Sequence, residues 1–100
     1  MQTHAKKLLV VITEGALEKL LARDVRRLGA HGYTVSDVRG GGERGERAAD
    51  WEADRSIRME VIGDEAVIGT IADHILATYC PNYAVSMYVA DCGVLRPHKF

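Results

Sequence analysis

Two segments with helical periodicity, each enclosed between runs of strand-forming residues, constrain the fold of this 100-residue chain more than any other feature. Residues 14–29 and 64–79 both repeat apolar side chains every three or four positions, as a helix with one buried face does. Gly29 predicts the end of the first helix, Asp64 the N-cap of the second, and Pro81 its end. The predicted buried stripes are Leu17, Leu20, Leu21, Val25 and Leu28 in the first helix and Val67, Ile68, Ile71, Ile75 and Leu76 in the second.

Four segments around these helices have the composition of strands. Residues 6–13 form an apolar, β-branched run, which predicts a buried central strand. Residues 33–39 and 84–91 are rich in strand formers, and 55–62 alternate apolar with charged side chains. The resulting order is strand, helix, strand, strand, helix, strand. It predicts one α+β domain over residues 1–100 with the ferredoxin-like βαββαβ arrangement.

The segment between the second and third strands, residues 40–54, differs from the rest of the chain. It opens with three glycines, adds Gly45 and many charges, and has one large apolar side chain, Trp51. Loops of this length inside a compact domain are usually functional. We therefore expect a long mobile loop here, and a basic tail at residues 96–100.

The same glycine-rich segment is a candidate anion site. Gly40, Gly42 and Gly45 satisfy the GxGxxG spacing, but no helical pattern follows, so a dinucleotide-binding turn is not expected. Consecutive glycines do allow backbone N–H groups to approach phosphate or carboxylate closely. A flexible hairpin with solvated charges fits the same residues. The candidate donors with forked, phosphate-matching geometry are Arg39, Arg44 and Arg47.

Composition argues against several classes of function. The net charge of -1 supplies no basic field for generic nucleic-acid binding, and no apolar run approaches the length of a membrane span. Cys80 and Cys92 match neither a disulfide framework nor a zinc motif. No nucleophile motif or carboxylate pair is recognisable, and His74 is expected to pack beside a buried stripe. We therefore expect a cytoplasmic protein that is not an enzyme and has no catalytic cofactor.

The chain resembles the PII signal-transduction superfamily. Residues 32–42 read Gly-Tyr-Thr-Val-Ser-Asp-Val-Arg-Gly-Gly-Gly, close to the superfamily signature Gly-x-Thr-Val-x-x-Val-x-Gly-x-Gly, which enters the long T-loop. The similarity continues through residues 57–62 and 88–91 and covers nearly the whole chain. Membership implies a homotrimer with adenine nucleotides bound between adjacent subunits.

The resemblance assigns the nucleotide site residue by residue. Gly32, Tyr33 and Thr34 match positions on the adenine and ribose side, and Glu60 and Ile62 match third-strand positions facing the same cleft. Arg96 matches a basic position that reaches the site from the neighbouring subunit. The expected phosphate-binding residues at the base of the T-loop are Gly40, Gly41, Gly42 and Arg44.

Departures from the nitrogen-regulatory members narrow the expected function. Residues 40–54 hold no tyrosine, so uridylylation is not expected, and residues 80–83 lack the lysine of the second phosphate-contacting loop. AMP or ADP is therefore favoured over ATP, and cyclic AMP stays open as a ligand. The arginine-rich loop is similar to that of members tied to bicarbonate uptake and carboxysomes, which implies a bicarbonate transporter or carboxysome component as partner. The expected bicarbonate residues are Gly42, Arg44 and Arg47.

Three other functions remain open on the sequence. A trimeric, CutA-like copper-tolerance protein would use Cys80, Cys92 and a histidine as soft ligands. A nucleic-acid module would need exposed aromatic residues on central strands, which the first and third strands lack. A regulatory domain of an enzyme would have the same fold.

Overall fold

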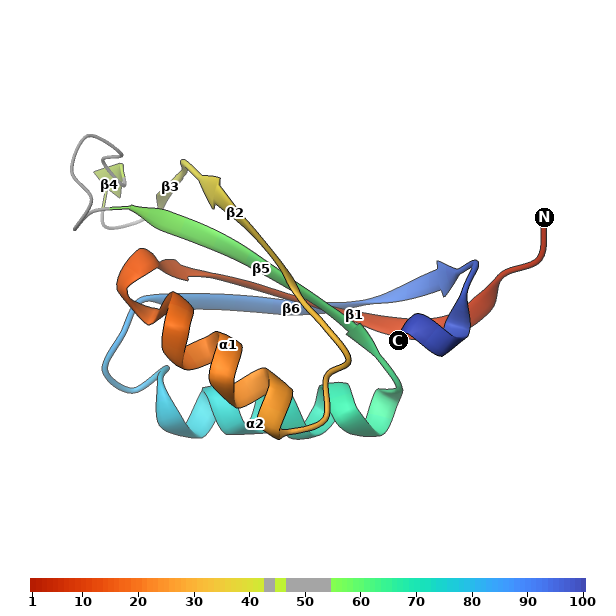
Figure 1. Ribbon diagram of the computed structural model, residues 1–100. Coiled ribbons are helices and arrows are strands. Elements are labelled where there is room, and N and C mark those ends of the chain that lie inside the picture. The colour runs from red at the N-terminus through yellow and green to blue at the C-terminus, as the bar shows by residue number, and fades with distance from the viewer. Residues whose placement is uncertain (43–44, 47–54) are drawn as a thin grey trace.

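The computed structural model describes residues 1–42, 45–46 and 55–100, which form a four-stranded antiparallel sheet with two helices on one face (Figure 1). The strand order in the sheet is β2-β5-β1-β6. This is the ferredoxin-like arrangement that the order of elements predicts. The larger elements are β1 (His4–Glu14), α1 (Glu18–Arg27), β2 (Thr34–Val38), β5 (Ser56–Gly63), α2 (Glu65–Thr78) and β6 (Val85–Val94).

Short elements complete the chain. The 3-10 helix η1 (Gly15–Leu17) leads from β1 into α1, and η3 (Pro97–Lys99) lies in the expected basic tail. The strands β3 (Gly41–Gly42) and β4 (Gly45–Glu46) pair with each other inside the expected loop. Residues 43–44 and 47–54, including Trp51, lie outside the described part of the chain, so the mobility of the loop remains a prediction.

The central position of β1 follows from its composition. It pairs with β5 on one side and with β6 on the other, and Leu9 and Val11 are fully buried beneath the helices. In β5 the apolar residues Ile57, Met59 and Val61 are also fully buried. Because side chains alternate along a strand, the residues between them face away from the helices. The sheet therefore has a covered face and an open face.

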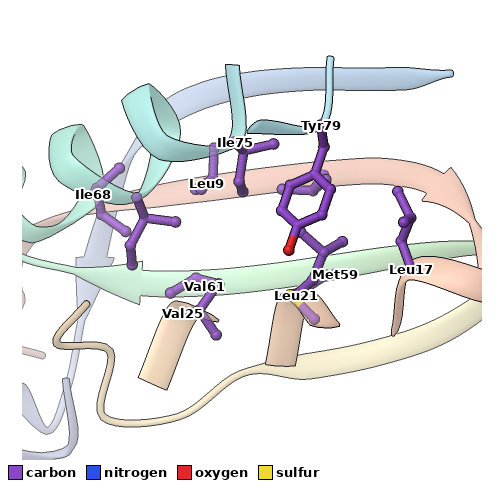
Figure 2. Packing of buried hydrophobic residues seen from close by; sticks show 11 residues of the cluster. Leu9, Leu17, Leu21, Val25, Met59, Val61, Ile68, Ile75 and Tyr79 are labelled. Carbon is purple, nitrogen blue, oxygen red and sulfur yellow. The ribbon is translucent and has the colours of Figure 1, made fainter. Parts of the chain in front are cut away.

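The two helices bury narrower stripes than the sequence predicts. Figure 2 shows Leu21 and Val25 of α1 and Ile68 and Ile75 of α2 converging on the covered face of the sheet. Leu20 and Leu76 are 38% and 54% exposed, so their assignment to the stripes is wrong. Both lie beside the row of residues that points at the sheet, because two layers need only one contact face per helix.

The core prediction can be tested with a matched pair of alanine variants on one helix. Ile71 is fully buried, and Ile71→Ala is expected to lower the free energy of unfolding by about 3 kcal/mol because it leaves a cavity. Leu76→Ala removes a largely exposed side chain and is expected to cost less than about 1 kcal/mol. Urea denaturation measures both values. Equal losses would contradict the packing described here.

A buried polar cluster joins the two helices. The carboxylate of Asp24, 3% exposed, accepts hydrogen bonds from the Tyr79 hydroxyl at 2.5 Å and from Arg23 at 3.1 Å, and His74 Nε2 lies 2.9 Å from its Oδ2. Burial raises the pKa of Asp24, but these hydrogen bonds outweigh burial and the pKa is lowered. Burial and the hydrogen bond to Asp24 raise the pKa of Tyr79. His74 thus serves the packing of α2 against α1.

The helices begin and end within a few residues of the predicted positions. Gly29 has a φ of 113°, the left-handed conformation that ends α1 at little cost for glycine. Asp64 precedes α2, yet its side chain makes no capping bond and instead pairs with Lys6 at 2.6 Å.

Among the residues that the structure describes, no helix is long and apolar enough to span a membrane.

Candidate functional site

The open face of the sheet carries the residues that the sequence singles out on the second and third strands. β2 and β5 pair with Thr34 opposite Glu60, Ser36 opposite Arg58, and Val38 opposite Ser56. Met59 and Val61 belong to the core, so their neighbours on β5 point to the opposite face. The strand alternation thus brings polar side chains from two separate segments together on one surface.

One cavity, of about 170 Å³, lies at the end of this surface where β2 begins, and we call it the Thr34 pocket. Glu60 can accept hydrogen bonds from hydroxyl or amino groups, and Ile62 and Phe100 offer apolar contact to a ring. The Arg26 guanidinium lies over the Tyr33 ring, 5.4 Å from its centre, in a cation–π contact. The lining residues are Gly32, Tyr33, Thr34, Glu60, Ile62, Lys99 and Phe100.

Five of these seven residues are ones that the resemblance assigns to a nucleotide cleft, and three of the five are assigned to its adenine and ribose side. Lys99 and Phe100 were missed. They come from the segment after β6, and nothing local in that segment indicates where it returns to the sheet. Its one sequence signal is that Phe100 is the single phenylalanine of the chain.

A second cavity, of about 350 Å³, lies at the other end of the same surface, and we call it the Gly40 pocket. Two guanidinium groups, two serine hydroxyls and glycine backbone meet there, which is a donor set suited to an anion. The Arg58 side chain donates to the Tyr88 hydroxyl at 3.2 Å and lies 3.8 Å from Glu60. The lining residues are Ile12, Val38, Arg39, Gly40, Gly41, Ser56, Arg58 and Ser86.

The predicted anion residues are only partly brought together. Gly40 and Gly41 line the Gly40 pocket with Arg39, whereas Gly42 pairs in β3. Arg44 and Arg47 lie outside the described residues. Sequence reasoning missed Ser56, Arg58 and Ser86, because their shared position depends on strand pairing across β1.

The two pockets lie at opposite ends of β2, but their linings approach each other on β5, where Arg58 Nε of the Gly40 pocket lies 3.8 Å from Glu60 Oε2 of the Thr34 pocket. Thr34 lines the first and Gly40 the second, and six residues of extended chain span about 20 Å. Arg96, the predicted contribution of a neighbouring subunit, is exposed at the start of η3 and lines neither pocket. Each chain therefore carries two neighbouring pockets on one surface of the sheet.

A third cavity, of about 540 Å³, lies at the N-terminal end of β1 and does not have the character of a metal site. Its lysines are paired with aspartates, Lys6 with Asp64 at 2.6 Å and Lys7 with Asp91 at 2.5 Å. The hydrogen bond between the latter two raises the pKa of Lys7 and lowers that of Asp91.

The copper hypothesis places its two cysteines at different ends of the fold. Cys92 lines this large cavity with Glu65, at the start of α2, whereas Cys80 follows the end of that helix, about 20 Å away along 14 residues. Within residues 1–42, 45–46 and 55–100, no group of three histidine, cysteine or carboxylate side chains could hold a metal ion. Nothing in this part of the chain favours the copper hypothesis.

Comparison with known proteins gives matches along almost the whole chain. A PII-like signalling protein from Thermus thermophilus is 41% identical, with a TM-score of 0.87 over 100% of this chain and 99% of that one. CPII from Thiomonas intermedia K12, solved with ADP, AMP and bicarbonate, is 25% identical, with a TM-score of 0.87 over 99% of this chain and 96% of that one. A DUF3240 protein from Shewanella baltica OS155, 16% identical with a TM-score of 0.68, shares the fold.

The family model described as nitrogen regulatory protein P-II matches residues 6–99. This range includes β2, β5 and the strand-to-loop junction, where the residues of both pockets gather. With a family match over nearly the full length and a relative at 41% identity, the chain belongs to the P-II family.

Proposed function

We propose that this protein is a PII-like regulatory protein that senses an adenine nucleotide, AMP or ADP, together with bicarbonate. The observation that carries the proposal is the Thr34 pocket, in which five residues that the resemblance assigns to the nucleotide cleft lie around one cavity. A P-II relative that was solved with ADP, AMP and bicarbonate supports the same ligand class.

The base and ribose bind in the Thr34 pocket. Ile62 and Phe100 supply apolar surface for the adenine ring, and Glu60 accepts hydrogen bonds from ribose hydroxyls or the exocyclic amine. The Lys99 side chain adds one positive charge at the same cavity.

The phosphates bind in the Gly40 pocket of an adjacent subunit. Thr34 and Gly40 lie about 20 Å apart along β2, and Arg96, which the resemblance assigns to a neighbouring subunit, lines neither pocket of its own chain. A homotrimer in which the Thr34 pocket of one protomer faces the Gly40 pocket of the next closes the site. Arg96 then reaches the same cleft, and Gly42 and Arg44 extend the phosphate contacts.

Bicarbonate binds next to the phosphate. It is a small planar anion, and Arg39, Arg58 and two serine hydroxyls offer the donors it requires. Arg47 completes the proposed set from the loop, with Gly42 and Arg44. The absence of a lysine in residues 80–83 leaves fewer cationic groups for a triphosphate, which favours AMP and ADP over ATP.

The bound anions order residues 40–54 and so change the surface offered to a protein partner. The proposed partner is a bicarbonate transporter or a carboxysome component, which makes the protein a reporter of inorganic-carbon or energy status in the cytoplasm or at the carboxysome. It turns over no substrate, in keeping with the regulatory character of the P-II family.

Calorimetric titration with AMP, ADP, ATP and cyclic AMP, each with and without bicarbonate, tests the proposal. We expect a dissociation constant on the order of micromolar for AMP or ADP, as is ordinary for a small ligand in a partly apolar cleft, and a shift with bicarbonate. Folded protein that binds no adenine nucleotide would overturn the proposed function.

A further inference from the structure

We propose that Arg55 is a positioning residue for the Gly40 pocket: it binds no ligand itself but fixes the strands that line the pocket. The proposal rests on the proposed function, since the affected ligand group is the phosphate. Arg55 directly precedes β5, whose first residues Ser56 and Arg58 line the pocket.

Arg55 lies on the covered face of the sheet, behind the pocket. Side chains alternate along β5, so Arg55 shares the face of the buried Ile57, whereas Ser56 and Arg58 face the pocket. Asp37 on β2 lies opposite Ile57 and so points to the same side as Arg55. An effect of Arg55 on a ligand in the Gly40 pocket must therefore pass through the strands.

The contacts of Arg55 join three elements around the pocket. One terminal nitrogen lies 3.3 Å from Asp37 Oδ1 on β2. The other lies 3.1 Å from Glu18 Oε1 on α1 and 3.4 Å from the Gly15 carbonyl oxygen. The backbone closes the arrangement, because the Gly15 N–H donates to the Arg55 carbonyl oxygen at 2.6 Å. Arg55 thus ties the start of β5 to β2, η1 and α1.

The Arg55 side chain lies so close to Gly15 that no side chain fits at that position. A Cβ atom at this position would lie 2.6 Å from Arg55 Nε and 3.1 Å from its carbonyl oxygen, both closer than ordinary packing allows. The glycine is therefore required by the neighbouring arginine, since its own backbone is not left-handed.

The action of Arg55 is geometric because its charge is already balanced. Glu18 and Asp37 both lie within salt-bridge distance, so the group adds no net positive charge for an anion on the other face. A guanidinium reaches several acceptors at fixed angles, whereas a lysine ammonium at the same place cannot match this planar geometry. Arg55→Lys therefore keeps the charge of the side chain and removes its planar geometry, whereas Arg55→Ala removes both.

The test compares ADP with adenosine, which lacks the phosphates, by calorimetry on wild type, Arg55→Ala and Arg55→Lys. We expect Arg55→Ala to weaken ADP binding about tenfold and adenosine binding less than about twofold, because the Thr34 pocket is distant from Arg55. Arg55→Lys is expected to remain several-fold weaker than wild type. The control is Lys19→Ala, which removes an exposed charge from α1 and is expected to change neither affinity.

Each outcome bears on a definite claim. Unchanged ADP affinity, equal losses for both ligands, or full rescue by lysine would overturn the positioning role. Wild-type protein that binds neither ligand would instead overturn the proposed function, before any variant is compared. Thermal unfolding shows whether Arg55→Ala is folded. If it is not, Asp37→Asn and Glu18→Gln replace it, because each removes one ion pair of Arg55. Both must then lose more affinity for ADP than for adenosine.

Discussion

Asp24→Ala is expected to lower the free energy of unfolding by about 4 kcal/mol, the largest loss we expect from any single substitution in this protein. The variant removes the acceptor of hydrogen bonds from Tyr79 and Arg23 and the neighbour of His74. It also leaves the buried Tyr79 hydroxyl without its partner. Urea denaturation monitored by circular dichroism measures the loss, with the exposed Asp73→Ala on α2 as control.

The pH dependence of stability gives a second test of the contribution of the Asp24 carboxylate. The folded pKa of Asp24 is lower than its ordinary value of 3.8, so its ionised form contributes stability above that value. This contribution is lost as the pH falls through the folded pKa. The stability difference between wild type and Asp24→Asn should therefore narrow as the pH falls below about pH 4. A difference that stays constant to pH 2 would contradict the assignment.

Arg39→Glu is expected to weaken ADP binding about a hundredfold while leaving adenosine binding almost unchanged. Arg39 lines the Gly40 pocket, the proposed phosphate site, and the reversed charge would add repulsion to the loss of a charge-assisted hydrogen bond. It lies at the opposite end of β2 from the Thr34 pocket, so the base retains its contacts. Calorimetry with both ligands measures the difference.

The control for this charge reversal is Lys19→Glu, on the exposed side of α1. It changes the net charge by the same amount as Arg39→Glu, so it reports any general effect of charge on a phosphate ligand. ADP affinity that falls equally in both variants would count against a phosphate site in the Gly40 pocket.

The sequence predicted the order of elements and the faces of the strands, because both are local properties. The alternation over residues 55–62 is enough to place Met59 in the core and Glu60 on the open face. The helical periodicity was less exact, since Leu20 and Leu76 fall beside the buried stripes rather than within them. How wide a stripe is buried depends on the neighbouring layer, which the helix sequence does not contain.

The candidate site was predictable only where a known family pattern covers it. The resemblance located Thr34 and Glu60, which the structure brings opposite each other. Phe100 and Ser86 come from segments whose partners in the pockets lie far away along the chain, so no local signal indicates their place. The same applies to Arg55, whose three contacts depend on the assembled sheet and helix.

The proposed division of the nucleotide site between two protomers has a consequence for how the proposed sensor responds to dilution. On the proposed assembly a lone protomer offers a nucleotide only half of its contacts, so ligand binding and subunit association must promote each other by mass action. The concentration of nucleotide at which the protein switches then depends on the concentration of the protein itself. A cell could alter the threshold of the sensor through the amount it makes, without any change in the site.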